Sequence, residues 1–196
     1  MKLPVIFLLL SVVVTTFARE QPEPQLLTKV RPLPVALDPD FQFRKTKLYF
    51  LGERAQATKS KGTKAAAPGQ AAATTTKSKS SSAVQDASIN FERQYRLFGA
   101  VTKLDQHERF GDYLDFFWRA KRPADVTVRL EYQQEKLHAH VQAQEISYRN
   151  ARGTMQSEFK VIGDDYADNG RIIAWRCVLV VDGRIVAEDR SFMWRG

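Results

Sequence analysis

The sequence predicts an all-β protein whose folded part, residues 88–196, is a single antiparallel β-sandwich of immunoglobulin-like or fibronectin-like kind with about seven strands. Apolar and polar residues alternate with a period of two from Phe91 onward, as expected of strands that bury one face. Residues that favour tight turns separate these runs, and no run keeps the period of an amphipathic helix. A disordered linker and an amino-terminal targeting segment are predicted to precede the domain.

The clearest alternation lies in Val126–Gln133, where the even-numbered residues are apolar and the odd-numbered residues are polar. This pattern is typical of an antiparallel strand with one wet face. Four further runs place apolar residues on one side: Tyr95, Leu97, Gly99 and Val101; Leu114, Phe116, Trp118 and Ala120; Leu137, Ala139, Val141 and Ala143; and Met155, Phe159 and Val161.

The last part of the chain predicts a β-hairpin. The segment Arg171–Val181 is apolar on both faces, which indicates a central strand covered on each side. Asp182 and Gly183 follow it and supply the positive φ angles of a two-residue turn, so residues 184–194 are expected to return as the partner strand. Earlier in the domain, residues 122–124 (Arg-Pro-Ala) are expected to separate two strands.

Residues 1–18 form the predicted targeting segment. Lys2 precedes an apolar stretch from residue 3 to residue 18, and the stretch ends in Thr16, Phe17 and Ala18, which resembles a cleavage site. The segment is expected to be a signal peptide, with an uncleaved membrane anchor as the alternative. Both alternatives export the remaining chain, which predicts a periplasmic, secreted or outward-facing anchored protein.

Between the targeting segment and the domain, the sequence predicts two spacers. Residues 19–57 form a Pro-rich spacer, and the five prolines of residues 21–40 are expected to keep that part extended and outside any sheet or helix. Within it, the aromatic and basic residues 41–54 predict a short helix, a strand docked on the domain or a surface-binding segment. Residues 58–85 are rich in Lys, Ala, Ser and Thr and predict a disordered linker.

The formal net charge of +8 is concentrated outside the predicted domain. Residues 19–90 carry twelve Lys and Arg against six Asp and Glu, whereas residues 91–196 carry seventeen against sixteen. The folded part is nearly neutral, so no nucleic-acid partner is expected. The expected partner is another envelope or extracellular protein, and an anionic membrane or wall surface is the alternative, contacted through the lysines of the linker.

Two histidines and three aspartates are weak candidates for ligand binding. His138 and His140 are predicted to share the polar face of a strand, a spacing that would suit zinc if a third ligand approached. The carboxylates of Asp164, Asp165 and Asp168 gather in one predicted loop, but the helix-loop-helix calcium template fails there. No cofactor is therefore expected.

Phe117 is the last weak candidate, because alternation places it on the face opposite Phe116 and Trp118. It is expected to mark an exposed binding patch or a sheet face covered by residues 41–54. The single cysteine, Cys177, excludes an intramolecular disulfide and lies within an apolar run, which indicates burial.

No catalytic constellation is present, so the sequence predicts that the protein is not an enzyme. The expected function is noncatalytic binding: an extracytoplasmic adaptor that uses a sheet face or an edge strand. The alternatives are an anionic-surface binding protein and a domain that binds a small ligand or metal.

Overall fold

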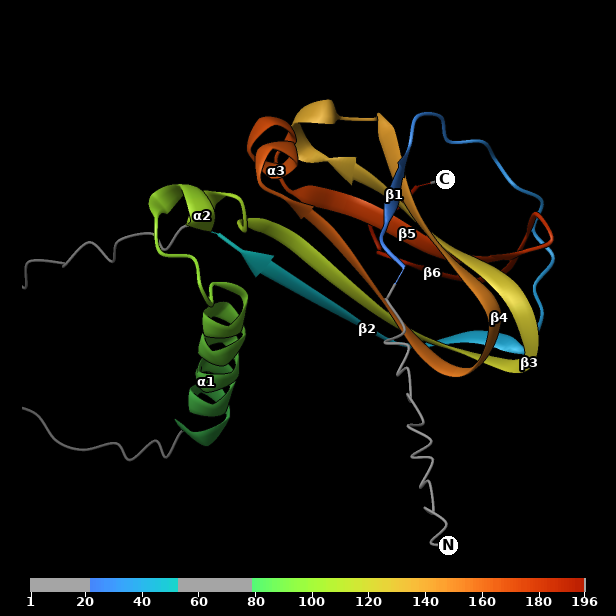
Figure 1. The fold of residues 1–196 in the computed structure, drawn as a ribbon, viewed down its shortest axis with the longest axis horizontal. Helices are drawn as coiled ribbons and strands as arrows, with labels where there is room; N and C mark the ends of the chain where they lie inside the picture. Colours follow the sequence, from blue (N-terminus) through green and yellow to red (C-terminus); the bar gives the residue numbers. More distant parts are fainter. Residues whose placement is uncertain (1–21, 53–78, 196) are drawn as a thin grey trace, which may run out of the picture.

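The computed structural model describes residues 22–52 and 79–195 of the 196-residue chain (Figure 1). The predicted targeting segment and most of the predicted linker lie outside the described residues. The elements in chain order are β1 (Gln25–Leu27), β2 (Phe41–Leu51), α1 (Lys79–Arg96), α2 (Lys103–His107), β3 (Gly111–Gln134), η1 (Glu135–Leu137), β4 (Val141–Ile162), α3 (Asp164–Asn169), β5 (Ile172–Val181) and β6 (Arg184–Arg190).

The strands form one antiparallel sheet in the order β1-β4-β3-β5-β6, and β2 pairs with the first half of β3. The predicted antiparallel β class is confirmed. The arrangement differs from the prediction, because the described residues form one open six-stranded sheet instead of two packed sheets with about seven strands. The difference arises mainly from β3 and β4, which are 24 and 22 residues long and each take the place of two predicted strands.

Strand β3 bends at residues 120–126 without ending. The pairing with β4 shifts register between Ala120 and Ala124 and again before Val126, as in a β-bulge. Pro123 lies in this exposed bulge, where no hydrogen bond of the ladder requires the amide donor that proline lacks. The prediction that residues 122–124 separate two strands was therefore wrong. The bend brings the inner faces of the two halves of the sheet toward each other (Figure 1).

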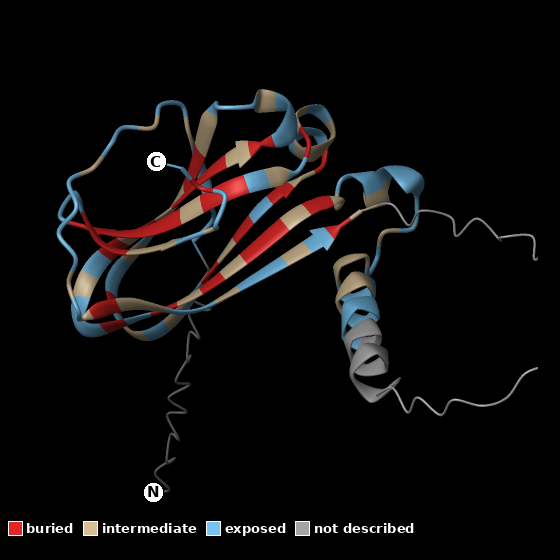
Figure 2. Cartoon of the chain, turned by 180° about the vertical axis from the view of Figure 1, so that it is seen from behind, coloured by how far each residue is buried: buried red, intermediate tan, exposed pale blue. Residues whose placement is uncertain are grey.

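The main core fills the concave side of this bent sheet. Even-numbered residues of both halves of β3 point inward, including Phe116, Trp118, Val128 and Leu130, and all four are fully buried (Figure 2). The Phe116 ring lies edge-on to the ring of Trp175 on β5, with 5.3 Å between centroids. The predicted alternation therefore identifies the core-facing side of β3 correctly.

The predicted hairpin at the end of the chain is confirmed. Asp182 and Gly183 have φ values of 50° and 71° between β5 and β6. Strand β5 is buried on both faces, since Cys177 lies in the main core while Val178 packs in a second cluster that Leu33 covers. The returning strand ends at Arg190 rather than Trp194.

Two segments differ from their predicted structure in the first half of the chain. Residues 95–101, expected to be a strand, form the end of α1 and a turn, and the side chains of Tyr95 and Val101 are exposed. The alternating apolar residues of this segment therefore do not form the buried face of a strand. The structure also places residues 79–85, at the end of the predicted linker, in α1.

The Pro-rich spacer contributes to the sheet, contrary to the prediction for residues 21–40. Strand β1 pairs with β4, and Val35 forms a parallel bridge with Ile185. Of the three alternatives for residues 41–54, the structure shows the strand, β2, which pairs with β3 over its whole length.

Candidate functional site

Strand β2 pairs on one side only. Its partner is β3, and no other described strand pairs with it. Phe41 is buried, and Phe43 packs against the core with its ring 6.1 Å from that of Phe116. These aromatic side chains hold β2 on the core, while most of the strand remains accessible.

The alternation of hydrogen bonds shows which backbone groups of β2 face away from β3. The amide of Lys121 donates to the carbonyl of Asp40 at 2.9 Å, so the pair Asp40–Lys121 is hydrogen-bonded across the two strands. In an antiparallel ladder the next pairs alternate, which turns the N–H and C=O groups of Phe41 and Phe43 outward. The Phe41 amide donates to the Asp38 carbonyl in a turn. By the alternation of the ladder, the Phe43 groups face the open side of the strand.

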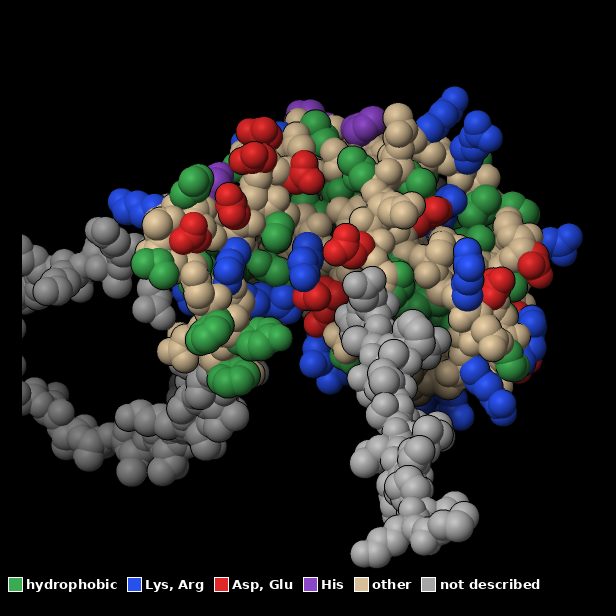
Figure 3. Space-filling view, in the orientation of Figure 1, with side chains coloured by type: hydrophobic (Ala, Val, Ile, Leu, Met, Phe, Trp, Pro, Cys, Tyr) green, Lys and Arg blue, Asp and Glu red, His purple; other side chains and the backbone are tan. Residues whose placement is uncertain are grey.

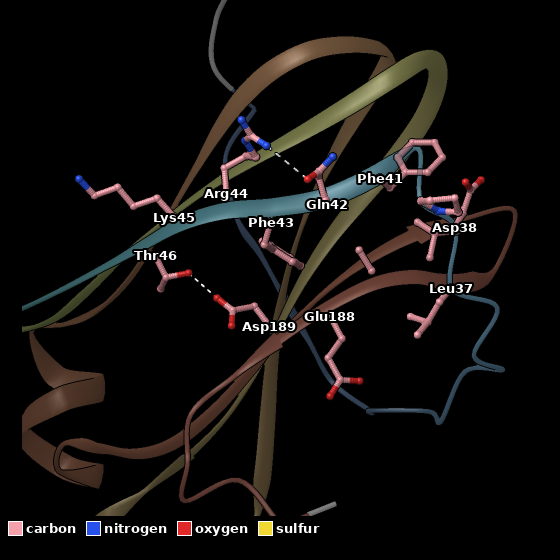
Figure 4. Close-up of a pocket in the computed structure, with 13 residues that line it drawn as sticks. Leu37, Asp38, Phe41, Gln42, Phe43, Arg44, Lys45, Thr46, Glu188 and Asp189 are labelled. Atoms are coloured by element: carbon pink, nitrogen blue, oxygen red, sulfur yellow. Dashed lines mark hydrogen bonds between the residues drawn. The ribbon is translucent and has the colours of Figure 1, made fainter.

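A groove of about 740 Å³ runs along this open side, between the first half of β2 and residues 186–189 of β6 (Figure 4). The side chains of Phe43, Val186 and Ala187 line it with apolar surface. Gln42 and Arg44 also border the groove; their side chains project from β2 on the side opposite Phe43 and are joined by a hydrogen bond of 3.4 Å (Figure 4).

Polar contacts bound the groove at both ends. At one end the Thr46 hydroxyl donates to the carboxylate of Asp189 and ties β2 to β6. At the other end Asp38 accepts hydrogen bonds from Arg122, at 2.8 Å, and from the Asp40 amide. The hydrogen bond from Arg122 lowers the pKa of Asp38, so this carboxylate is charged at neutral pH.

A second cavity, of about 340 Å³, continues beside the later part of β2. Leu48 and Phe50 line it from β2, and Arg171 lies over the Phe50 ring at 4.0 Å from the centroid. Asp112 accepts a hydrogen bond of 2.8 Å from the Ile172 amide, and burial raises the pKa of this carboxyl. The open side of β2 is therefore bordered by cavities along most of its length.

The predicted histidine pair does not lie on a strand. His138 follows η1 with a φ of 51°, and His140 lies in the turn before β4, with both side chains exposed. The alternation that placed them on one strand face fails because β4 begins only at Val141.

The three aspartates lie on the short helix α3, where Asp164, Asp165 and Asp168 are exposed. The nearest imidazole nitrogen, on His107, lies 3.9 Å from Asp164. Within residues 22–52 and 79–195, no three His, Cys, Asp or Glu side chains are grouped as metal ligands.

Phe117 is half-buried on the outer face of β3, opposite the core. The ammonium of Lys47 lies 5.4 Å from the centre of its ring, and β2 runs beside Phe117 in the same sheet. Cys177 is fully buried, and this burial raises the pKa of its thiol well above the usual value.

The residues that form the groove were not singled out by the sequence, although the aromatic and basic composition of residues 41–54 marked one of its walls. The other wall could not be found from local pattern, because Asp189 lies 143 residues after Thr46. Only the curvature of the sheet brings the two walls together.

Comparisons with protein-family models, with curated proteins and with solved structures found no match. In the described part of the chain, no helix combines the length and hydrophobicity that a membrane crossing requires.

Proposed function

We propose that this protein is a noncatalytic binding protein that holds an extended segment of another protein in the groove between β2 and β6. One observation carries the proposal: a strand of 11 residues pairs on one side only, and a groove lined by both apolar and polar residues follows its open side. Unpaired strand edges are templates for the addition of a further strand.

The backbone of β2 supplies the affinity in this proposal. The N–H and C=O of Phe43 face the groove and can pair with the backbone of an extended peptide, in the manner of a strand added to a sheet edge. Main-chain pairing accepts many sequences, so the lining must supply the specificity.

The lining favours a segment whose alternate side chains are apolar. Successive side chains of an extended peptide point to opposite sides, so every second one would meet Phe43, Val186 and Ala187. The side chains between them would face solvent and can be polar.

The expected location of this binding is outside the cytoplasm. The apolar stretch of residues 3–18 supports export, and the partner is then another envelope or extracellular protein. The near-neutral charge of residues 91–196 supports a protein partner rather than a nucleic acid.

A matched pair of substitutions at Phe43 tests the backbone contact. Peptides are first selected from a displayed random library on the full-length chain, and their dissociation constants are measured by calorimetry. Phe43→Ala removes the ring and keeps the amide donor, whereas Phe43→Pro removes both. A net hydrogen bond of about 1 kcal/mol predicts that the proline variant binds about fivefold more weakly than the alanine variant.

Lys47→Ala is the control, because this side chain lies exposed on the outer face of the same strand and should leave peptide affinity unchanged. Equal affinities of the Phe43→Ala and Phe43→Pro variants would refute strand addition at this edge. Selection of peptides that bind but leave the Phe43 amide unprotected from hydrogen exchange would refute it as well.

A further inference from the structure

Helix α1 turns a charged side toward the sheet. The guanidinium of Arg93 donates to the carbonyl of Gly52 at 2.7 Å, and that of Arg96 donates to the carboxylate of Glu158 at 2.9 Å. Arg96 also lies 3.9 Å from the centre of the Tyr113 ring. These contacts hold the helix against the end of β2 and the adjoining strands.

A neighbouring side of α1 is apolar and largely exposed, and Tyr95 and Phe98 also line a cavity beside Tyr113 and Glu158 of the sheet. Phe91 and Tyr95 lie four residues apart, which places them on one side of the helix, and Phe98 follows in the turn after α1. Val101 and Leu104 continue the apolar series into α2. We call these five residues the helical apolar patch; their side chains are between 66% and 87% exposed.

The patch is comparable in area to the largest apolar patch on a typical monomeric protein. Figure 3 shows hydrophobic side chains gathered over α1, with further ones over α2. At about 200 Å² for each aromatic side chain, the three rings alone expose roughly 400 Å². Patches of this size are often functional, and larger ones mark sites of contact with a membrane or another protein. Helices on a protein surface usually turn their apolar side inward, whereas Phe91 and Tyr95 of α1 are each 69% exposed.

The net charge of the sequence around the patch favours an anionic surface, since residues 58–108 carry eight Lys and Arg against four Asp and Glu, with Asp105 and Glu108 among the acids. The sequence that leads into α1, residues 58–83, carries five lysines and no acidic residue. Lys103 begins α2 within the patch itself. Lysines beside an apolar helical face are typical of segments that lie in the interface of anionic membranes.

We propose that the helical apolar patch docks on an anionic phospholipid surface, with the axis of α1 along the membrane and its aromatic side chains among the lipid headgroups. This inference is independent of the peptide groove. The groove begins at Phe41, whereas α1 contacts Gly52, beyond the other end of β2. Both surfaces can therefore be occupied at once.

A fluorescent probe at position 95 of the full-length chain tests the docking. Tyr95→Cys, labelled with a polarity-sensitive nitrobenzoxadiazole dye, reports on the patch, and Ser147→Cys, exposed on β4, is the matched control. The native Cys177 is fully buried and its thiol has a raised pKa, so it should not take the label in the folded protein. Residues 3–18 could bind a bilayer by themselves, so total binding of the chain to vesicles would not report on the patch. The dye instead reports the polarity at position 95 alone.

Vesicles of equal parts phosphatidylcholine and phosphatidylglycerol should shift the emission at position 95 to the blue and leave position 147 unchanged. Pure phosphatidylcholine should give a weaker response, and added salt should weaken the response on anionic vesicles. Phe91→Ser combined with Phe98→Ser in the labelled chain should raise the vesicle concentration for half response at least about tenfold, because two rings no longer leave water. Both side chains are exposed, so the melting temperature should not change.

Three results would overturn the proposal. An unchanged emission at position 95 on anionic vesicles would show that the patch does not meet lipid. A blue shift that rises with protein concentration without vesicles would assign the patch to a second copy of the chain. A blue shift that appears only with a selected soluble protein would assign it to a protein partner.

Discussion

Replacing Arg96 with alanine should loosen α1 from the sheet. The Arg96 side chain is only 8% exposed and donates to Glu158 at 2.9 Å. It also pairs with Glu92 at 2.8 Å, but that partner lies on the same helix and contributes little to docking. The ring of Tyr113 covers the guanidinium, and Asp115 lies 3.9 Å away.

The size of the effect follows from the two shortest types of contact that cross from the helix to the sheet, those with Glu158 and Tyr113. A hydrogen bond between charged groups contributes about 1.5–3 kcal/mol when buried, but Glu158 is one-third exposed, which places this bond near the lower limit. The cation–π contact with Tyr113 adds about 0.5–1 kcal/mol. The substitution should therefore cost about 2 kcal/mol, and the melting temperature should fall by about 4–8 °C if helix and sheet unfold together.

Urea unfolding and hydrogen exchange of α1 measure this effect together. If the helix opens alone, its amides should lose protection while those of β3 keep theirs. Arg93→Ala is the control, because it removes a single hydrogen bond, to the Gly52 carbonyl, and should cost less. A change below about 0.5 kcal/mol in Arg96→Ala, with unaltered protection of α1, would show that Arg96 does not hold the helix.

Three further predictions concern the core, a close backbone approach and acid. Phe116→Ala, which removes a fully buried ring between Phe159 and Trp175, should lower the free energy of unfolding by about 3–5 kcal/mol in urea titrations. Gly111→Ala should cost at least about 2 kcal/mol by the same measurement, because φ is +145° and an added Cβ would lie 2.1 Å from the Val161 carbonyl oxygen. Burial raises the pKa of Glu158, but the hydrogen bonds from Arg96 and Lys160 together outweigh burial. The net pKa of Glu158 therefore lies below the usual 4.5. Its contribution is present above pH 4.5 and is lost as pH falls through the lowered pKa, so Glu158→Gln should flatten this part of the stability profile.

Local pattern predicted the elements whose pairing partners follow closely in the chain. The hairpin of β5 and β6 needs only Asp182, Gly183 and the apolar runs beside them. The inward side of β3 follows from alternation alone, because a strand with one buried face repeats every two residues. Burial of Cys177 follows from the apolar run around it.

Contacts between segments far apart in the sequence could not be predicted from local pattern. Pro123 and its neighbours carry the composition of a turn, and only the pairing of β3 with β4 on both sides of the bulge shows that the strand continues. The Pro-rich segment joins the sheet because β4 and β6 have free edges. Gln25–Leu27 pair with the edge of β4, and Val35 pairs with Ile185 on the edge of β6. The groove needs both β2 and β6, which meet only after the sheet has curved.

The misassigned residues 95–101 bear on function as well as on fold. Alternating apolar residues predict a strand only if one face is buried, and here Tyr95 and Val101 are exposed. Burial in the sheet does not account for these side chains, and the proposed contact with lipid would give their apolar character a role. The open edge of β2 differs, since its aromatic residues Phe41 and Phe43 already pack on the core. The two proposed surfaces therefore depend on different physics, backbone pairing at the groove and burial of side chains at the helical apolar patch, and variants of one should leave binding at the other unchanged.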